Sequence, residues 1–367
     1  MKVAFRADAS LQMGSGHVMR CLTLANALRE KGAECHFLFR EHPGHMLAQI
    51  RAAGHIIHPL ALTPRVEAML EQQNILAHAG WLGASQSEDA QQSIDVLRGI
   101  QPDWLVVDHY ALDVRWHKAL RPFTKRLMVI DDLADRSHDC DLLLDQTFGR
   151  TGAEYLALVP EGCNVLCGSQ FALLRPEFPL LRLSSLVRRA DLTAVKQVLI
   201  TMGGVDQANA TTQVLKALAG MEYLAGLQIT VVMGGRAPWL HAVRQQVLQL
   251  PLSAEVLVDS QNMAELMARA DLAIGAAGST AWERCSLGLP SIMVVLAENQ
   301  LTVAAGLQEA GAAQVIACVE DIPGRLPALL APLLNEPHRL NQMSAAAAQV
   351  TNGEGVQAVI QAFDVWG

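Results

Sequence analysis

The chain opens with a short apolar run that ends on a carboxylate, followed by a turn with two glycines and a segment of helical periodicity. Residues 2–8 alternate as in a strand, Gly14 and Gly16 lie in the turn, and apolar side chains recur with helical spacing over residues 18–28. The pattern predicts a strand, a glycine loop and a helix. In this layout backbone N–H groups at the helix start face a bound anion. His17, which opens the helix, can exchange a proton there near neutral pH. For a glycine loop alone we favour an ordinary turn without a ligand, because short glycine motifs often match by chance.

The alternation of strand and helix continues through the first half of the chain. Short connections between such elements are typical of a parallel sheet that is covered by helices on both faces. A Ser-Gln-Ser-Glu stretch at residues 85–88 predicts a capping box that opens one of the helices. We expect strands at residues 33–40, 56–60, 104–110, 127–132 and 141–146, and helices at residues 44–53 and 85–97.

Polar residues gather where two of the predicted strands end. Asp108 and His109 follow one strand, and Asp131 and Asp132 follow another. Ligands of open parallel sheets collect beyond the carboxyl ends of strands, so these side chains fall on the same rim as His17. Their alternative role is N-capping of the helices that follow. We favour capping for Asp131 and Asp132, and both roles remain open for Asp108 and His109.

The periodicity weakens between residues 178 and 195, where a proline, two serines and an Arg-Arg pair interrupt it. Such a change is typical of a connection between domains. The sequence therefore predicts an N-terminal domain over residues 1–178, a linker over 179–195 and a C-terminal domain over 196–367. Two domains also fit a length of 367 residues, which is more than one core usually fills.

The second half restarts the pattern of strand, glycine turn and helix. Residues 198–202 predict a strand, Gly203 and Gly204 form the turn, and residues 210–218 predict a helix. The second predicted domain thus repeats the anion-binding layout of the first. Further strands are expected at residues 229–233 and 272–275, with a helix at residues 263–270.

Small and hydroxyl-bearing residues are concentrated in Gly278–Thr280, just after a predicted strand. Small residues let a ligand approach the backbone, and the two hydroxyl groups can donate to phosphate oxygens. Glu283 lies one turn further, where a carboxylate can accept hydrogen bonds from a ribose diol. The alternative roles are N-capping for the hydroxyl groups and a favourable helix-dipole position for Glu283. Asn299 and Gln300 follow the next strand and fit either a ligand contact or a solvated loop.

Composition narrows the class of partner. The net charge is −8 and no run of Lys or Arg follows a helix, which argues against a nucleic acid. No stretch approaches the roughly 18 uninterrupted apolar residues of a membrane span, so we expect no membrane partner. Seven scattered cysteines fit free thiols in a reducing compartment, and we expect a cytoplasmic protein. His42, His45, His55 and His58 fall on different elements, so we expect no metal site.

These motifs together resemble those of a known family. The matching stretches follow in the expected order and are Arg6–Asp8, Gly14–His17, Val107–Tyr110, Phe171–Arg175, Thr201–Gly204, Gly278–Glu283 and Glu298–Gln300. The chain resembles the UDP-sugar hydrolases of pseudaminic acid biosynthesis, which are similar to the MurG-type glycosyltransferases. The resemblance implies an α/β fold of the GT-B type, in which two doubly wound Rossmann-like domains face a central cleft and the C-terminal domain binds UDP.

The resemblance also implies a reaction and a set of site residues. UDP-2,4-diacetamido-2,4,6-trideoxy-β-L-altrose and water would give UDP and the free sugar, with inversion at the anomeric carbon and with no metal or cofactor. His17 would be the catalytic base, Glu283 would hold the ribose and Gly278–Thr280 the diphosphate. The implied substrate-binding residues are Gly14, Gly16, Asp108, His109, Gly203, Gly204, Gly278, Ser279, Thr280, Glu283, Asn299 and Gln300. The family commonly has asparagine where Thr147 stands, which leaves the contacts of that loop open.

Three other classes of protein remain to be weighed. A glycosyltransferase would use the same fold with an alcohol acceptor in place of water, although the chain has no evident basic amphipathic helix for a lipid acceptor. A non-catalytic module that binds sugar nucleotides would not need His17 in the glycine loop. An NAD-dependent dehydrogenase fits poorly, because Met19 stands where the third glycine of the dinucleotide fingerprint belongs.

Overall fold

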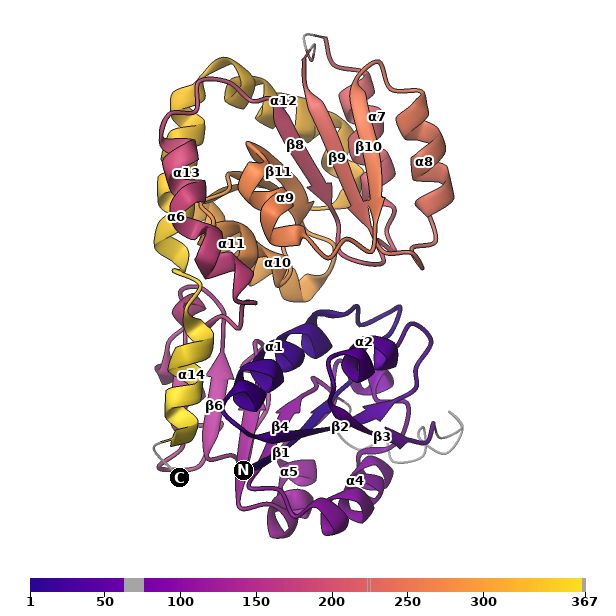
Figure 1. Ribbon diagram of the computed structural model, residues 1–367, viewed down its shortest axis with the longest axis vertical. Helices are drawn as coiled ribbons and strands as arrows, with labels where there is room; N and C mark the ends of the chain where they lie inside the picture. Colours follow the sequence, from indigo (N-terminus) through magenta and orange to yellow (C-terminus); the bar gives the residue numbers. More distant parts are fainter. Residues whose placement is uncertain (63–75, 223, 225, 365–367) are drawn as a thin grey trace. The chain divides into compact units, whose positions relative to one another are not determined.

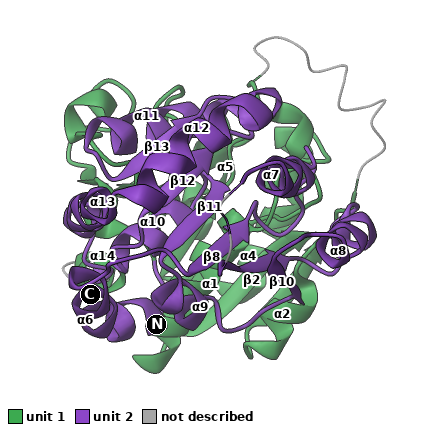
Figure 2. Cartoon of the chain, turned by 90° about the horizontal axis from the view of Figure 1, so that it is seen from above, with its two compact units in different colours: residues 1–173, 355–367 green, residues 174–354 purple. Residues whose placement is uncertain are grey.

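The computed structural model describes residues 1–62, 76–222, 224 and 226–364. The chain forms two compact units, which Figure 2 distinguishes by colour. Unit 1 comprises Met1–Leu173 and Gly355–Gly367, and unit 2 comprises Leu174–Glu354. Each unit is built on a parallel sheet of its own.

Among the described residues of unit 1, seven parallel strands form a sheet in the order β3-β2-β1-β4-β5-β6-β7 (Figure 1). The first strand pairs with both β2 and β4, so the strand order reverses beside it. Side chains at the carboxyl ends of β1 and β4 therefore meet where open α/β sheets bind ligands. The strands are β1 (Lys2–Ala7), β2 (Glu34–Arg40), β3 (Ile56–Leu60), β4 (Trp104–Asp108), β5 (Arg126–Ile130), β6 (Leu142–Asp145) and β7 (Asn164–Cys167).

Apolar side chains alternate between the two faces of this sheet. Val3 and Phe5 lie in one buried cluster with residues of α1 (Gly16–Glu30), and Ala4 lies in another with residues of α4 (Gln86–Ile100) and α5 (Val114–Leu120). The strands predicted for this half are confirmed, and β7 was not predicted. The other helical elements of unit 1 are α2 (Leu47–Ala52), α14 (Gly355–Asp364) and the short 3-10 turns η1 (Ala79–Trp81), η2 (Arg121–Phe123), η3 (Gly152–Tyr155) and η4 (Ser169–Phe171).

The capping box predicted before α4 is confirmed. The Ser85 hydroxyl accepts a hydrogen bond from the backbone N–H of Glu88 at 3.2 Å, and the Glu88 carboxylate accepts from the backbone N–H of Ser85 at 2.9 Å. This reciprocal pair satisfies donors that the first turn of a helix leaves unpaired. It fixes the start of α4, a helix that covers one face of the sheet of unit 1.

The last helix, α14, returns to unit 1. The ring of Phe363 lies 4.5 Å from the ring of Trp104, and Val359 and Ile360 are fully buried in the cluster that also contains Val3 and Phe5. The expectation of one continuous C-terminal domain over residues 196–367 is corrected accordingly. Helical periodicity shows that α14 has an apolar face, but it does not indicate which sheet that face covers.

The linker expected over residues 179–195 is for the most part a helix of unit 2, α6 (Glu177–Ala190). Arg182 donates hydrogen bonds to the backbone carbonyls of Ser286 and Ala348, and Arg189 donates to that of Met267. Helical periodicity is in fact clear along α6, although some of its leucines are exposed. The proline, the two serines and the Arg-Arg pair within the helix are what made the segment resemble a linker.

The sheet that the described residues of unit 2 form has the order β10-β9-β8-β11-β12-β13, so its strand order reverses between β8 and β11. The strands and helices predicted for this half are confirmed. The strands are β8 (Gln197–Thr201), β9 (Gln228–Met233), β10 (Ser253–Val258), β11 (Leu272–Ala276), β12 (Ser291–Val294) and β13 (Ala313–Ile316). The helices after α6 are α7 (Ala210–Ala219), α8 (Leu240–Leu248), α9 (Met263–Arg269), α10 (Thr280–Ser286), α11 (Leu301–Glu309), α12 (Ile322–Asn335) and α13 (Pro337–Val350), with 3-10 turns η5 (Glu298–Gln300) and η6 (Val319–Asp321). No helix in the described ranges is both long and apolar enough to cross a membrane.

Candidate functional site

His17 lies in the first turn of α1 and faces the end of β4. Its Nδ1 atom is 2.6 Å from the Oδ1 atom of Asp108, the last residue of that strand. The preceding turn depends on Gly14, which has a φ of +76° and donates its N–H to the carbonyl of Ser10 at 2.9 Å. A residue with a side chain is strained at such a φ. The glycine turn and the neighbouring strand therefore bring two of the predicted site residues together.

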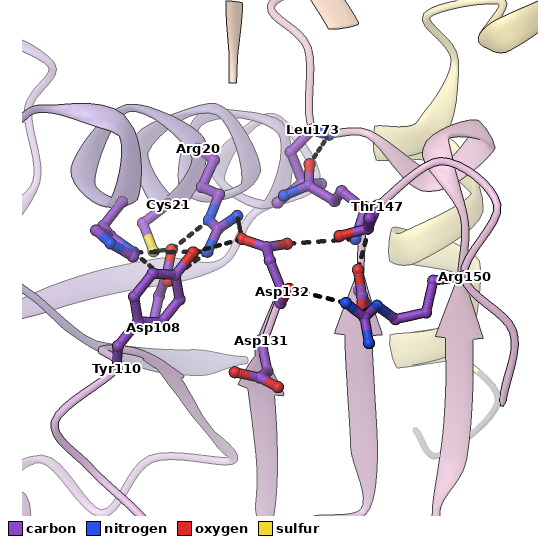
Figure 3. Close-up of polar contacts among 12 residues, drawn as sticks. Arg20, Cys21, Asp108, Tyr110, Asp131, Asp132, Thr147, Arg150 and Leu173 are labelled. Atoms are coloured by element: carbon purple, nitrogen blue, oxygen red, sulfur yellow. Dashed lines mark hydrogen bonds and ion pairs between the residues drawn. The ribbon is translucent and has the colours of Figure 1, made fainter. Parts of the chain in front are cut away.

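Arg20 completes this contact from the next turn of α1. Its Nε atom donates to Oδ2 of Asp108 at 2.6 Å, and its Nη2 atom donates to Oδ1 at 2.7 Å (Figure 3). Burial alone would raise the pKa of the fully buried Asp108 carboxyl, but the charge of Arg20 and the hydrogen bonds from Arg20 and His17 hold this pKa well below its ordinary value. Asp108 is therefore a carboxylate near neutral pH, fixed by a two-pronged arginine.

The protonation pattern of His17 follows from this carboxylate. Because the ionised Asp108 only accepts hydrogen bonds, Nδ1 of His17 carries the proton and the lone pair of the neutral ring lies on Nε2. Within the described residues, Nε2 has no hydrogen-bond partner, and the side chain is 10% exposed. An imidazole that is oriented by a carboxylate and free at its other nitrogen is the arrangement of a general base.

Aromatic rings surround the other side of His17. The ring of Tyr110 stands almost perpendicular to that of His17, with centroids 4.6 Å apart, and the ring of Trp81 lies 6.3 Å away. Trp81 and Tyr110 are themselves stacked at 5.9 Å. The Tyr110 hydroxyl donates to Asp132 Oδ2 at 2.8 Å, which fixes its ring. The half-buried Trp81 thus adds an apolar wall beside the candidate base.

The pair Asp131-Asp132 divides between two roles. Asp131 accepts from the N–H of Ala134 at 2.9 Å and pairs with Arg136 at 2.8 Å. Its role is structural, but the expected helix capping is corrected, because a turn and not a helix follows it. Asp132 instead accepts from Arg20 at 2.5 Å and from Tyr110. The capping interpretation of Asp132 is therefore corrected, because this carboxylate holds two groups that contact His17 or Asp108 (Figure 3).

A second group of polar residues extends from Asp132 to the loop after β6. Asp145 accepts from the N–H of Thr147 at 2.7 Å and pairs with Arg150 at 2.7 Å. Burial and the neighbouring charge of Asp132 raise the pKa of Asp145 to about 7. Gln146 fixes the same loop, because its side-chain oxygen accepts from the N–H of Leu173 at 2.6 Å. In this structure, Thr147 contributes a backbone donor to the loop.

His109 lies in a separate, buried network. Its Nδ1 atom accepts from the N–H of Ala111 at 3.1 Å, so its proton lies on Nε2, which is 3.3 Å from the Asp8 carboxylate. Asp8 also pairs with Arg6 at 2.8 Å, and the His109 side chain is only 1% exposed. The expected substrate contact of His109 is corrected on this ground: its ring supports the end of β1 and does not present a polar atom to a ligand.

The glycine turn of unit 2 differs from that of unit 1. The carboxylate of Asp206 accepts from the N–H groups of Ala210 and Thr211, each at 2.9 Å, at the start of α7. A protein carboxylate thus occupies the place that the sequence assigned to a bound anion. The carbonyl of Gly204 accepts from the N–H of Gly234 at 3.1 Å, and a Cβ atom at Gly234 would lie 2.2 Å from that oxygen. Close packing explains the glycine at position 234 without a ligand, and the substrate contacts expected of Gly203 and Gly204 stay predictions.

The Gly278–Thr280 stretch leads directly into α10. Ser279, at the N-cap position, is exposed and makes no side-chain capping bond, so capping does not account for its hydroxyl. Glu283 lies with its Oε1 atom 3.5 Å from Nη2 of Arg175, and burial raises the pKa of its carboxyl. Arg175 in turn lies over the ring of Phe178 at 5.3 Å. Arg175 belongs to the Phe171–Arg175 stretch that carries the family resemblance, but no role was predicted for it.

Asn299 and Gln300 are in the turn η5. The side-chain oxygen of Gln300 accepts from the N–H of Leu296 at 3.0 Å, and a Cβ atom at Gly278 would lie 3.8 Å from its Nε2 atom. Gln300 therefore lies beside the Gly278 backbone, and Asn299 is exposed next to it. Where the chain is described, no group of three or more His, Cys, Asp or Glu side chains is arranged to hold a metal ion.

Comparisons with known proteins complete the description. Residues 198–360 match the model of the glycosyltransferase family 28 C-terminal domain. The chain is 25% identical over 311 residues to the UDP-2,4-diacetamido-2,4,6-trideoxy-beta-L-altropyranose hydrolase of Campylobacter jejuni, which covers 85% of this chain and 97% of that protein. It is 26% identical over 305 residues to an uncharacterized protein of Methanocaldococcus jannaschii. That match covers 82% of this chain but 56% of the other protein, so this chain spans little more than half of that protein's length.

The solved structure of MurG from Acinetobacter baumannii matches the chain with a TM-score of 0.66 and 16% sequence identity, over 98% of both chains. Two α/β units with parallel sheets, together with this likeness, show that the chain has a GT-B fold, as the resemblance implied.

Proposed function

We propose that this chain hydrolyses a UDP-sugar to UDP and the free sugar, with His17 as the general base. The observation that carries the proposal is the 2.6 Å contact between Nδ1 of His17 and the buried Asp108, which leaves Nε2 ready to accept a proton. The Campylobacter jejuni relative, which is similar along nearly its whole length, is named as such a hydrolase.

The proposed step is a single displacement at the anomeric carbon. A water oxygen forms the new C1–O bond while the bond from C1 to the phosphate oxygen breaks, and UDP leaves with the bonding electrons. Nε2 of His17 takes the proton of the water, and Asp108 stabilises the resulting imidazolium. Arg20 keeps the Asp108 carboxylate in place by its two hydrogen bonds. A positioned base typically contributes about 10²–10⁴ in rate.

The proposed nucleotide contacts lie in unit 2. The exposed hydroxyl of Ser279 and the backbone of Gly278–Thr280 would bind the diphosphate, and the carboxylate of Glu283 would accept from the ribose hydroxyls. The family model matched by residues 198–360 spans all of these positions and supports the assignment.

For the sugar we propose UDP-2,4-diacetamido-2,4,6-trideoxy-β-L-altrose, after the name of the Campylobacter jejuni relative. Such a sugar has a methyl group at C6 and two acetamido methyl groups, so it presents more apolar surface than a fully hydroxylated hexose. The half-buried ring of Trp81 beside His17, which stacks on the buried Tyr110, offers a surface of matching character.

The position of an oxygen label tests the proposal. The wild-type chain is incubated with the UDP-sugar in ¹⁸O-labelled water, with EDTA and without an acceptor, and the products are examined by mass spectrometry. We expect the label in the free sugar, because water attacks carbon. Label in UDP would mean attack at phosphorus and would contradict the proposed step.

A glycosyltransferase is the second candidate, because the matched family model is that of a glycosyltransferase domain. The same His17 would then deprotonate an alcohol of the acceptor instead of water. A chain that releases no UDP in the labelling experiment, but does so once a sugar or lipid-linked acceptor is added, would favour this function.

A further inference from the structure

Arg284, in α10, has a side chain that is fully buried in unit 2. Its Nη2 atom donates to the carbonyl of Ala276 at 2.7 Å, and its Nη1 atom donates to Oγ1 of Thr280 at 3.3 Å. Its Nε atom has no hydrogen-bond partner. Within the described part of the chain, no carboxylate forms an ion pair with this guanidinium. The hydrogen-bond partners of Arg284 are therefore neutral, and the neighbouring Glu283 carboxylate acts on its charge without a direct contact.

The surrounding backbone is shaped to admit this guanidinium. A Cβ atom at Gly275 would lie 2.7 Å from Nη1 of Arg284 and 2.7 Å from the carbonyl oxygen of Thr201. Only a glycine leaves the necessary space at the end of β11. Burying a charge that no carboxylate contacts directly is costly. Burial lowers the pKa of Arg284 to about 10, so the group still carries its charge at neutral pH.

The hydrogen bond to Thr280 links the buried guanidinium of Arg284 to a side chain that is only partly buried. Because Oγ1 of Thr280 accepts from Arg284, the hydroxyl proton of Thr280 is left to donate elsewhere. Thr280 is only partly buried, and Ser279 beside it is exposed. The buried guanidinium is thus hydrogen-bonded to the stretch to which the proposed function assigns a diphosphate.

We propose that Arg284 is a positioning residue for a nucleoside diphosphate: it turns the Thr280 hydroxyl toward the phosphate oxygens and supplies the positive charge that a bound diphosphate compensates. This inference rests on the proposed function, and it adds a residue to which neither the motifs nor the comparisons give a role. A buried charge–charge interaction of this kind favours ligands according to their negative charge.

Arg189 provides a matched control in the same unit. It is also buried, and it also donates to backbone carbonyls, those of Met267 and Ala270. Ala270 precedes β11, whereas Ala276 ends it, so the two arginines lie at opposite ends of one strand. Replacing either arginine removes a buried guanidinium, but only Arg284 is next to Thr280.

The experiment measures the affinities of UDP by calorimetry and of uridine by NMR titration, for the full chain and for Arg284→Met, Arg284→Lys and Arg189→Met. We expect Arg284→Met to weaken UDP at least about tenfold while uridine changes less than twofold. Arg284→Lys should keep part of the preference for UDP, and Arg189→Met should keep all of it. A purely structural role would lower both affinities together, or only the unfolding temperature.

An unchanged ratio of UDP to uridine affinity in Arg284→Met would overturn the inference. Should that variant fail to fold, the UDP affinities of Thr280→Val and Thr280→Ser are compared instead. A loss of UDP affinity in Thr280→Val but not in Thr280→Ser supports the inference, and equal UDP affinities of the two variants overturn it. A wild-type chain that binds neither UDP nor uridine would instead contradict the proposed function itself, and the inference with it.

Discussion

Nδ1 of His17 and Oδ1 of Asp108 lie 2.6 Å apart although 91 residues separate them in the sequence. The contact joins the first turn of α1 to the last residue of β4, beside the point where the strand order of the sheet reverses. Arg20 holds the same carboxylate from the other side. The chemistry proposed for the chain depends on this geometry, which makes it the first target for substitution.

Asp108→Asn should lower kcat by about 10²–10⁴ and leave UDP affinity within twofold. An amide in place of the carboxylate no longer stabilises the imidazolium, and it can donate to Nδ1 and so favour the wrong tautomer of His17. Steady-state kinetics together with UDP titration check this expectation. A kcat close to that of the wild type would show that the contact with Asp108 does not serve catalysis.

The stability of the fold should depend on pH through the ionisation of the Asp108 carboxyl. Arg20 and His17 hold the pKa of folded Asp108 well below its ordinary value despite burial, whereas an unfolded aspartate has a pKa of about 3.9. The ionised group therefore stabilises the fold above about pH 4, and this contribution is lost as the pH falls further toward the folded pKa. The difference in unfolding temperature between wild type and Asp108→Asn should narrow below about pH 4. A difference that stays constant down to pH 2 would be inconsistent with a lowered pKa.

Trp81→Ala should raise KM for the UDP-sugar about tenfold without changing the affinity for UDP. The indole lies 6.3 Å from the ring of His17 and offers apolar contact to the sugar, which UDP lacks. Trp81→Phe is the matched control and should retain most of the affinity. Inhibition by UDP, measured in the same assay, separates the two effects, and parallel losses for both ligands would rule out a role specific to the sugar.

Glu283→Gln should reduce the affinity for UDP about tenfold and abolish the preference for UDP over its 2′-deoxy analogue. A carboxylate accepts two strong hydrogen bonds from a ribose diol, whereas an amide accepts more weakly. Arg175, 3.5 Å away, keeps its own position over Phe178 in the variant. Titration of both nucleotides checks this, and an equal preference in wild type and variant would argue against the ribose contact.

The sequence predicted the candidate site residues that lie at the carboxyl ends of parallel strands. His17 and Asp108 both lie where a strand or loop meets the rim of a parallel sheet, and this follows from hydrophobic pattern alone. Arg20 was missed, although it lies one helical turn after His17 and so on the same face of α1. The position of Trp81 beside His17 and the ion pair between Asp132 and Arg20 depend on contacts between distant segments. Hydrophobic periodicity gives no signal for such contacts.

The sequence pattern also does not show which distant segments an element contacts, and this explains why α14 and α6 were assigned wrongly. An apolar stripe predicts that α14 is buried but not that it joins the sheet of unit 1. In α6, Arg182 and the buried Arg189 donate hydrogen bonds to backbone carbonyls, and polar residues in a segment otherwise typical of a helix led to the prediction of a linker. Asp206 shows the converse case, because a glycine turn before a helix predicts an anion and the chain supplies that anion itself.

The rate of a single turnover in His17→Ala tests the central claim most directly. Enzyme in excess over the UDP-sugar is mixed rapidly, and UDP release is followed alongside UDP affinity, with the exposed His338→Ala as the matched control. The account predicts a rate lower by about 10²–10⁴, partial recovery with added imidazole, and UDP affinity within twofold of the wild type. An unchanged rate in His17→Ala would contradict the assignment of His17 as the base.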